Sequence, residues 1–136
     1  MMHDLYFENV ASIGNLYLDY VMFSFENEPI VFICSDDKYN PYLCLCSEIR
    51  IEQKWIITKC STTILKRLET KEIDLRSALR ANDTVMVITV STNSKEKSKV
   101  LKLCELDDLD FPEPDVFLDC NIVDIDALYS KDGLAP

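Results

Sequence analysis

Glycine is scarce in this sequence, with two copies in 136 residues. Glycine supplies the positive-φ positions of phosphate-binding loops and of two-residue hairpin turns, so this scarcity disfavours both features. Histidine is scarcer still, and its single copy, His3, lies at the N-terminus. A nucleophilic cysteine needs a nearby base or cation, so the absence of a central histidine argues against thiol catalysis.

Long apolar runs are also missing. No run approaches the roughly 18 to 20 residues of a membrane-spanning helix, so no membrane partner is expected. The first ten residues, MMHDLYFENV, lack the basic region and the continuous apolar core of a signal peptide. We therefore expect a cytoplasmic protein. With 48% apolar residues, the chain is expected to form a single domain over residues 1–136.

The chain has six cysteines, yet their setting does not indicate disulfides. Cys34, Cys44, Cys46 and Cys60 lie in apolar stretches, where cysteine behaves as a small buried hydrophobe. Without an export signal, free thiols are expected. Cys44 and Cys46 are separated by one residue, unlike the paired cysteine knuckles of structural zinc sites, so we predict no metal and no other cofactor.

Apolar stretches along the chain predict an antiparallel sheet. Residues 16–25 are rich in aromatic and branched side chains and alternate as in a strand with one face more buried. Residues 42–46 form a nearly unbroken apolar run, which is typical of a strand covered on both faces. A solvated loop at residues 91–99 separates two apolar runs that plausibly form a hairpin. Further predicted features are strands at 29–34, 55–57, 85–90 and 100–106, an aromatic segment at 5–7 and a turn at 14–15.

Capping residues mark two helix starts. Ser61 or Thr62 can accept a hydrogen bond from an amide of a first helical turn, and Asp74 can do so for a second, shorter helix. The apolar residues that follow each cap recur at helical spacing, so each helix has an apolar side for the sheet. Those residues are Ile64, Leu65, Leu68, Leu75, Ala78 and Leu79. We therefore predict an α+β fold, a bent antiparallel sheet of five to seven strands with one or two short helices packed on it.

One longer pattern, a Trp-led strand followed by S-x-x-x-L-x-x-L-x-x-x-x-I-D-L-R-x-A, covers the centre of the chain. Its residues are Trp55, Ser61, Leu65, Leu68, Ile73, Asp74, Leu75, Arg76 and Ala78. This order resembles a group of small uncharacterised bacterial and phage domains over roughly residues 28–90. The resemblance implies a fold, and it implies no activity and no site.

Acidic residues gather near the C-terminus. Residues 105–132 contain ten acids and one base, Lys131, whereas residues 1–104 contain 14 acids and 13 bases. These blocks contribute −9 and −1 to the net charge of −10. Apolar side chains are interspersed among the acids, so the segment differs from a plain disordered tail. We expect an acidic C-terminal segment, residues 105–132, attached to the domain.

This segment suggests a binding protein without catalysis. Carboxylates interleaved with apolar residues can meet a basic groove, where charge raises the association rate and apolar contacts supply affinity. Such a surface can block a basic or nucleic-acid-binding site on a partner protein, by analogy with phage anti-defence inhibitors, including anti-CRISPR proteins, and bacterial immunity proteins. Direct nucleic-acid binding is disfavoured by the net charge. The expected partner-binding residues, with Phe111 as the anchor, are Asp107, Asp108, Asp110, Phe111, Glu113 and Asp115.

Two alternatives remain open at this point. The acidic segment can be a solubilising edge that packs on the domain without binding a partner. The chain can also be a small-ligand-binding or enzymatic domain with a pocket between sheet and helix, near Trp55 and Arg76. Arg76 would then clamp an anionic group, although a surface salt bridge is the commoner use of such an arginine.

Overall fold

The computed structural model describes residues 4–48, 52–90 and 96–119. Over these residues the chain forms one antiparallel sheet of seven strands, each paired with its neighbours in sequence. The strands are β1 (Asp4–Val10), β2 (Gly14–Phe25), β3 (Glu28–Ser35), β4 (Pro41–Glu48), β5 (Gln53–Lys59), β6 (Thr84–Val90) and β7 (Glu96–Lys102). With the helices α1 (Thr62–Glu69) and α2 (Leu75–Leu79), this is the predicted α+β fold.

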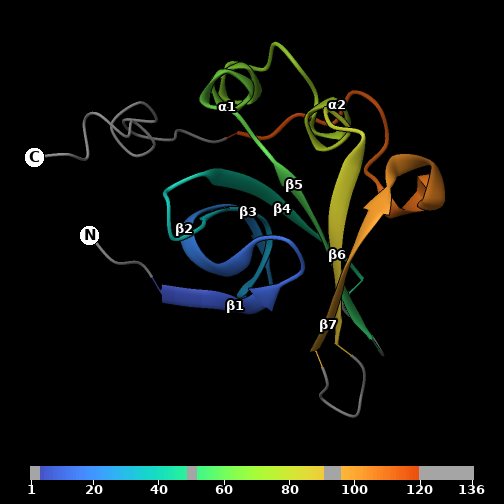
Figure 1. Ribbon diagram of the computed structural model, residues 1–136. Coiled ribbons are helices and arrows are strands. Elements are labelled where there is room, and N and C mark those ends of the chain that lie inside the picture. The colour runs from blue at the N-terminus through green and yellow to red at the C-terminus, as the bar shows by residue number, and fades with distance from the viewer. Residues whose placement is uncertain (1–3, 49–51, 91–95, 120–136) are drawn as a thin grey trace, which may run out of the picture.

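The sheet is curled and buries both of its faces. Figure 1 shows the strands bending around an interior, with the two helices outside the curl. Phe7 of β1 reaches across that interior to Trp55 of β5, with ring centroids 5.3 Å apart. Side chains along one strand alternate between the layers, so Phe32 lies inside the curl and Ile33 lies on the helix side. Burial on both faces explains the near-continuous apolar runs of the central strands.

Two apolar layers result from this alternation. We call the layer inside the curl the inner core; its members include Phe7, Leu16, Phe32, Cys44, Trp55, Ile57, Met86 and Ile88. The layer between sheet and helices is the outer core; its members include Val31, Ile33, Leu43, Ile56, Leu65, Leu68, Leu79, Val87 and Phe111. The sheet backbone separates the two cores, and Ile30 packs against both of them.

Irregular pairing of β2 contributes to the curl. The register with β3 shifts at three places between Leu18 and Ser24, and such bulges bend a strand and increase its twist. The two edges of the curl then come close together. Beyond the end of β1, the Ala11 amide donates a 2.8 Å hydrogen bond to Ser98 Oγ on β7. A side chain thus links the two edges without any ladder between β1 and β7 in the described pairing.

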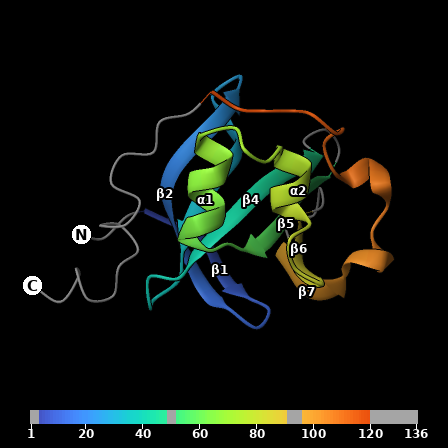
Figure 2. The ribbon, with the colours of Figure 1, turned by 90° about the horizontal axis from the view of Figure 1, so that it is seen from above.

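Both predicted helix caps are confirmed. Ser61 Oγ accepts a hydrogen bond from the Ile64 amide at 3.1 Å, and Asp74 Oδ1 accepts one from the Ser77 amide at 2.8 Å. Figure 2 shows α1 and α2 side by side across the sheet. Leu65 and Leu68 lie on the side of α1 that faces the sheet, and both are buried in the outer core. No helix in residues 4–48, 52–90 or 96–119 is long and apolar enough to cross a membrane.

Three predicted boundaries are wrong. The strand predicted at 100–106 begins earlier, at Glu96, and ends at Lys102, where a short 3-10 turn, η1 (Leu103–Glu105), begins. The Glu105 carboxylate accepts the Lys102 amide at 2.9 Å and so ends the strand. Part of the predicted 91–99 loop is therefore strand, and 91–95 lie outside the described residues. The first turn occupies residues 11–13, so Gly14 already belongs to β2.

Candidate functional site

The acidic segment is docked on the domain over the part that the structure describes, residues 105–119. We call this part the acidic strap. It leaves η1, passes a second 3-10 turn, η2 (Asp108–Asp110), beside α2, and then crosses toward α1 (Figure 2). Leu106, Phe111 and Leu118 pack against the outer core. The helical turns predicted at residues 124–130 lie outside the described residues.

Phe111 is the side chain that holds the strap down. It is 6% exposed, and the Arg80 guanidinium lies over its ring, 5.2 Å from the centroid. Burial of a phenylalanine side chain is worth about 1.5–3 kcal/mol, which exceeds a typical surface ion pair. The residue that the sequence suggested as a partner anchor is thus inside the protein's own core. In this arrangement a partner reaches Phe111 only by displacing the strap.

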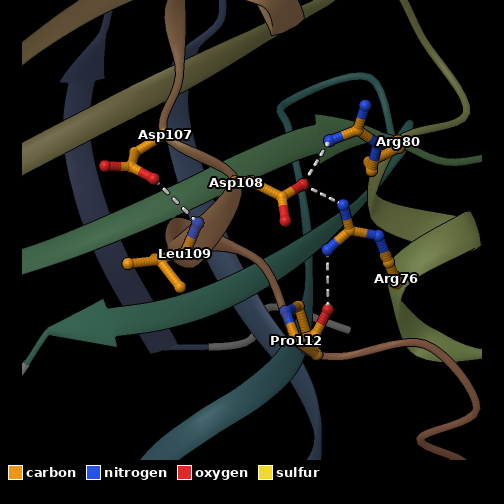
Figure 3. Close-up of polar contacts among 6 residues, drawn as sticks. All are labelled: Arg76, Arg80, Asp107, Asp108, Leu109 and Pro112. Carbon is orange, nitrogen blue, oxygen red and sulfur yellow. Dashed lines mark hydrogen bonds and ion pairs between the residues drawn. The ribbon is translucent and has the colours of Figure 1, made fainter.

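Two arginines of the α2 region fix the turn before Phe111 (Figure 3). Arg76 forms an ion pair with the Asp108 carboxylate and also donates a 3.0 Å hydrogen bond to the Pro112 carbonyl. Arg80 Nη1 lies 3.8 Å from the same Asp108 oxygen. Arg76 therefore holds the chain on both sides of Phe111. This is the surface salt bridge that the sequence offered as the commoner use of Arg76.

Further ion pairs tie the strap to other elements. Lys54 of β5 bonds the Asp110 carboxylate at 3.0 Å, and both side chains are largely buried, with exposures of 28% and 20%. Lys71, in the link between the helices, pairs with Asp119. The hydrogen bond and charge of Lys71 lower the pKa of the Asp119 carboxyl below its usual value. The strap is thus held by cations from three separate parts of the chain.

Asp74 caps α2 and also bonds the strap. One of its carboxylate oxygens accepts the Ser77 amide, and the other accepts the Asp115 amide at 2.8 Å. The next strap carbonyl, Val116, accepts the Leu75 amide at 2.9 Å. Hydrogen bonds from Ser77 and then from Asp115 lower the pKa of Asp74 to about 2. The first turn of α2 therefore recognises the strap backbone.

The six predicted site residues divide into two groups. Asp107, Asp108 and Asp110 come together on one turn with Phe111, and the Asp107 carboxylate accepts the Leu109 amide at 3.0 Å. The other two, Glu113 and Asp115, lie past Pro112, toward the start of α2. Their side chains are exposed and have no ion pair within the described residues.

Leu109 is the surface residue that sequence reasoning missed. It is 89% exposed, more than any other large apolar side chain that the structure describes. Figure 3 shows its side chain directed away from the two arginines. The pattern D-D-L-D-F could have indicated this exposure. Asp108 and Asp110 form ion pairs with cations of the domain, and the apolar residue between them stays exposed to solvent.

The predicted pocket near Trp55 and Arg76 is not formed by those two residues. Trp55 belongs to the inner core, whereas Arg76 lies on α2 on the other side of the sheet. The indole Nε1 of Trp55 is buried and has no hydrogen-bond partner in the described residues. Within the same residues, no group of three or more potential metal ligands is found.

The buried thiols are confirmed. Cys34, Cys44, Cys46 and Cys60 are free and buried, and Cys104 is free and exposed. Burial raises the pKa of Cys46 to about 11 and that of Cys60 to about 12. The raised pKa values favour the protonated thiols of Cys46 and Cys60 near neutral pH, as expected of small core residues.

The charge of the chain divides into three blocks, not two. Residues 1–37 contain seven acids and neither lysine nor arginine, which gives −7. Residues 38–104 contain 13 bases and seven acids, or +6, and residues 105–136 contain ten acids and one base, or −9. All four cations that pair with the strap come from the middle block. The expectation that acidity is local to the C-terminal segment therefore needs correcting.

No protein-family model matches the chain, and no curated protein or solved structure matches it significantly.

Proposed function

We propose that the protein is a small cytoplasmic binding protein without catalysis, which presents the turn at residues 107–110 to a basic site on a partner protein. The observation that supports this most is Leu109, an apolar side chain that is 89% exposed on a turn held from several directions. A single exposed leucine is ordinary on a protein surface. A leucine fixed at the tip of a braced, acidic turn has the features of a binding anchor.

The physical reason why Leu109 can act as a binding anchor is that the turn is preorganised. The turn is fixed by the Asp107 cap, by the Asp108 and Asp110 ion pairs and by burial of Phe111. Binding through Leu109 therefore costs little additional conformational entropy, because the backbone around it is already ordered. Leu109 would fill an apolar pocket of the partner, and Phe111 would act indirectly by keeping the turn in place.

The carboxylates define the chemistry of the partner. Asp107 is exposed, and the Asp108 side chain is 73% exposed even in its ion pair with Arg76. Lysine and arginine residues around the partner's apolar pocket would meet these charges, which raise the association rate and favour a basic partner. Carboxylates so placed can stand in for phosphates, so the favoured partner is a nucleic-acid-handling protein. By analogy with phage anti-defence inhibitors, including anti-CRISPR proteins, and with bacterial immunity proteins, the chain would block the basic site of its partner.

The test is affinity capture from a bacterial lysate at low salt, repeated at about 0.5 M salt, where exposed charge pairs are largely screened. The captured protein is then titrated against Leu109→Ala and against Leu5→Ala, the same change at a 45% exposed leucine on β1. We expect Leu109→Ala to weaken binding about tenfold or more and Leu5→Ala to leave it unchanged.

Charge removal gives a second measurement on the same partner. Asp107→Asn keeps a side-chain oxygen for the Leu109 amide, so it should lower the association rate and its salt dependence while the melting temperature changes little. If the captured protein binds Leu109→Ala and Asp107→Asn as tightly as the natural chain, the strap is not the binding surface. In that case the acidic strap is only a packed edge of the domain.

A further inference from the structure

The acidic strap lies on the domain as a bound peptide lies in a groove. We call the surface under it the strap groove; its apolar part is the outer core that Phe111 packs into, and its cations are Lys54, Arg76 and Arg80. Each cation forms an ion pair with Asp108 or Asp110 of the strap. Phe111 is the one buried side chain among residues 105–119. The groove therefore recognises an aromatic ring that follows two carboxylates spaced two residues apart.

Three contacts in the groove are made with the strap backbone. Arg76 donates a 3.0 Å hydrogen bond to the Pro112 carbonyl (Figure 3). The Asp74 carboxylate accepts the Asp115 amide at 2.8 Å, and the next strap carbonyl accepts the Leu75 amide at 2.9 Å. Backbone contacts do not depend on the side chains of the bound segment, so a segment of different sequence can form them.

The strap can be displaced because few of its contacts are buried. The Asp108 and Asp119 side chains are 73% and 92% exposed in their ion pairs, and exposed ion pairs contribute little to stability. Burial of Phe111 and the partly buried pair of Lys54 with Asp110 are the main contacts that opening would break. An open strap is therefore expected as a minor population, which a competing segment can capture.

Charge and backbone contacts determine which competitor fits. Residues 38–104, which supply all the groove cations, carry a net charge of +6, so an acidic segment is attracted once the strap opens. A nucleic acid would bring phosphates next to the Asp74 carboxylate, and it lacks the peptide amide that this carboxylate accepts. A second copy of this chain has a strap of its own and the same net charge of −10, which opposes association. These observations favour an acidic segment of another protein.

The geometry points to the strap groove as a binding site for an acidic, aromatic-containing segment of a partner protein, which replaces the strap. Its expected pattern is an acid, any residue, a second acid and then an aromatic residue, as from Asp108 to Phe111. Its carboxylates would meet Arg76, Arg80 and Lys54, and its ring would take the place of Phe111. This inference does not rest on the function proposed for the turn, because it concerns the surface that the strap covers.

A labelled synthetic peptide with the sequence of residues 106–118 is a suitable probe, and its matched control is the same peptide with Phe111→Ala. Fluorescence anisotropy compares the natural full chain with the full chain carrying Phe111→Ala, in which the strap loses its buried side chain. The probe should bind this variant at least about tenfold more tightly than the natural chain, because the groove is open in more molecules. The control peptide should bind the variant at least about tenfold more weakly than the probe.

Further variants locate the binding and guard against a folding defect. Asp108→Asn with Asp110→Asn loosens the strap while keeping Phe111, and it should also strengthen probe binding, by about threefold or more. Arg76→Gln, added to the Phe111→Ala chain, should weaken probe binding about fivefold. Arg67→Gln, at an exposed position of α1, should leave it unchanged.

Three outcomes overturn the proposal. Equal binding of the probe to the natural chain and to the Phe111→Ala chain would mean that the strap does not cover the site. A single-stranded oligonucleotide of about 15 nucleotides that displaces the probe better than unlabelled peptide does would mean that the groove recognises charge alone. Sedimentation showing a dimer of the natural chain that the unlabelled peptide dissociates would mean that the strap of a second copy occupies the groove.

Discussion

Two acidic regions of this molecule differ in where their counter-charges come from. The strap lies against four cations of the basic middle block, and its apolar residues are drawn into the outer core with it. The β2–β3 hairpin belongs to a block with no cation, and its apolar residues Phe23 and Phe25 stay at the surface. The net charge of −10 therefore combines one acidic region whose carboxylates pair with cations of the fold and another whose own block of sequence contains no cation.

An acidic stretch that contains an aromatic residue does not by itself predict whether that aromatic residue is buried or exposed. Phe111 directly follows a carboxylate residue in the sequence, and Phe25 directly precedes one. Phe111 is nevertheless 6% exposed, whereas Phe25 is 52% exposed. The difference lies in residues far away along the chain, such as Arg76 and Lys54, which hold the carboxylates next to Phe111. Each of the following changes tests how far this difference extends.

Removing the apolar anchor of the strap should have the largest effect. Phe111→Ala deletes a buried aromatic side chain and should lower the free energy of unfolding by about 3 kcal/mol. The midpoint of urea denaturation measures this. Phe117→Ala, the same change at a 43% exposed strap residue, should cost less than about 1 kcal/mol. Equal losses for the two variants would mean that the strap is not held through Phe111.

Removing the arginine that holds the strap should have the next largest effect. Arg76→Gln loses the Asp108 ion pair and the bond to the Pro112 carbonyl, and we expect a loss of about 1 kcal/mol. Arg67→Gln makes the same change at an exposed position of α1 and should stay within about 0.5 kcal/mol. The gap between the variants should narrow at high salt, since Asp108 is largely exposed. A gap that salt leaves unchanged would contradict an ionic contribution to docking.

Much of the fold followed from local patterns in the sequence. The apolar run at 42–46 and the caps at Ser61 and Asp74 act within one strand or one helical turn, so neighbouring residues suffice to predict them. The β7 boundary was missed because it depends on the carboxylate of Glu105, which closes a turn after the strand. Periodicity alone does not report such a bond.

The candidate site was only partly predictable. Its acids were found because ten of them stand together in sequence. Phe111, predicted as an exposed anchor, is buried, and Leu109 is the exposed apolar residue of the turn. The direction of each side chain depends on Arg76 and Lys54, which are 35 and 57 positions before Phe111. Likewise, the pocket expected near Trp55 and Arg76 is not formed by these two residues, because Trp55 lies inside the curl of the sheet and Arg76 lies on α2. Long-range contacts of this kind leave no periodic signal.

Acid should affect the strap through Asp74. The pKa of this carboxyl is about 2 in the folded chain and near 3.8 in the unfolded chain, so protonation favours unfolding. Its contribution to stability is complete above about pH 4 and is lost as the pH falls through about 2. Asp74→Asn mimics the protonated form. The difference in unfolding free energy between this variant and the natural chain should therefore shrink as the pH falls from about 4 to about 2. In a titration followed by nuclear magnetic resonance, the Asp115 amide should shift with the Asp74 carboxyl, and a midpoint near 3.8 would contradict the hydrogen bonds.

The smallest change in stability is expected for neutralising the acids of the β2–β3 hairpin. Glu26→Gln and Glu28→Gln neutralise exposed acids that have no ion pair among the described residues, within a block that has no cation. Their combined effect on the free energy of unfolding should stay within about 0.5 kcal/mol, with a slight gain at low salt from reduced repulsion. Asp108→Asn with Asp110→Asn also removes two charges, but it should destabilise because both carboxylates are paired. Urea denaturation of the two double variants at low and high salt makes the test. If both pairs shift stability in the same direction, the two acidic regions are equivalent, and the division between a folding role and a surface role is wrong.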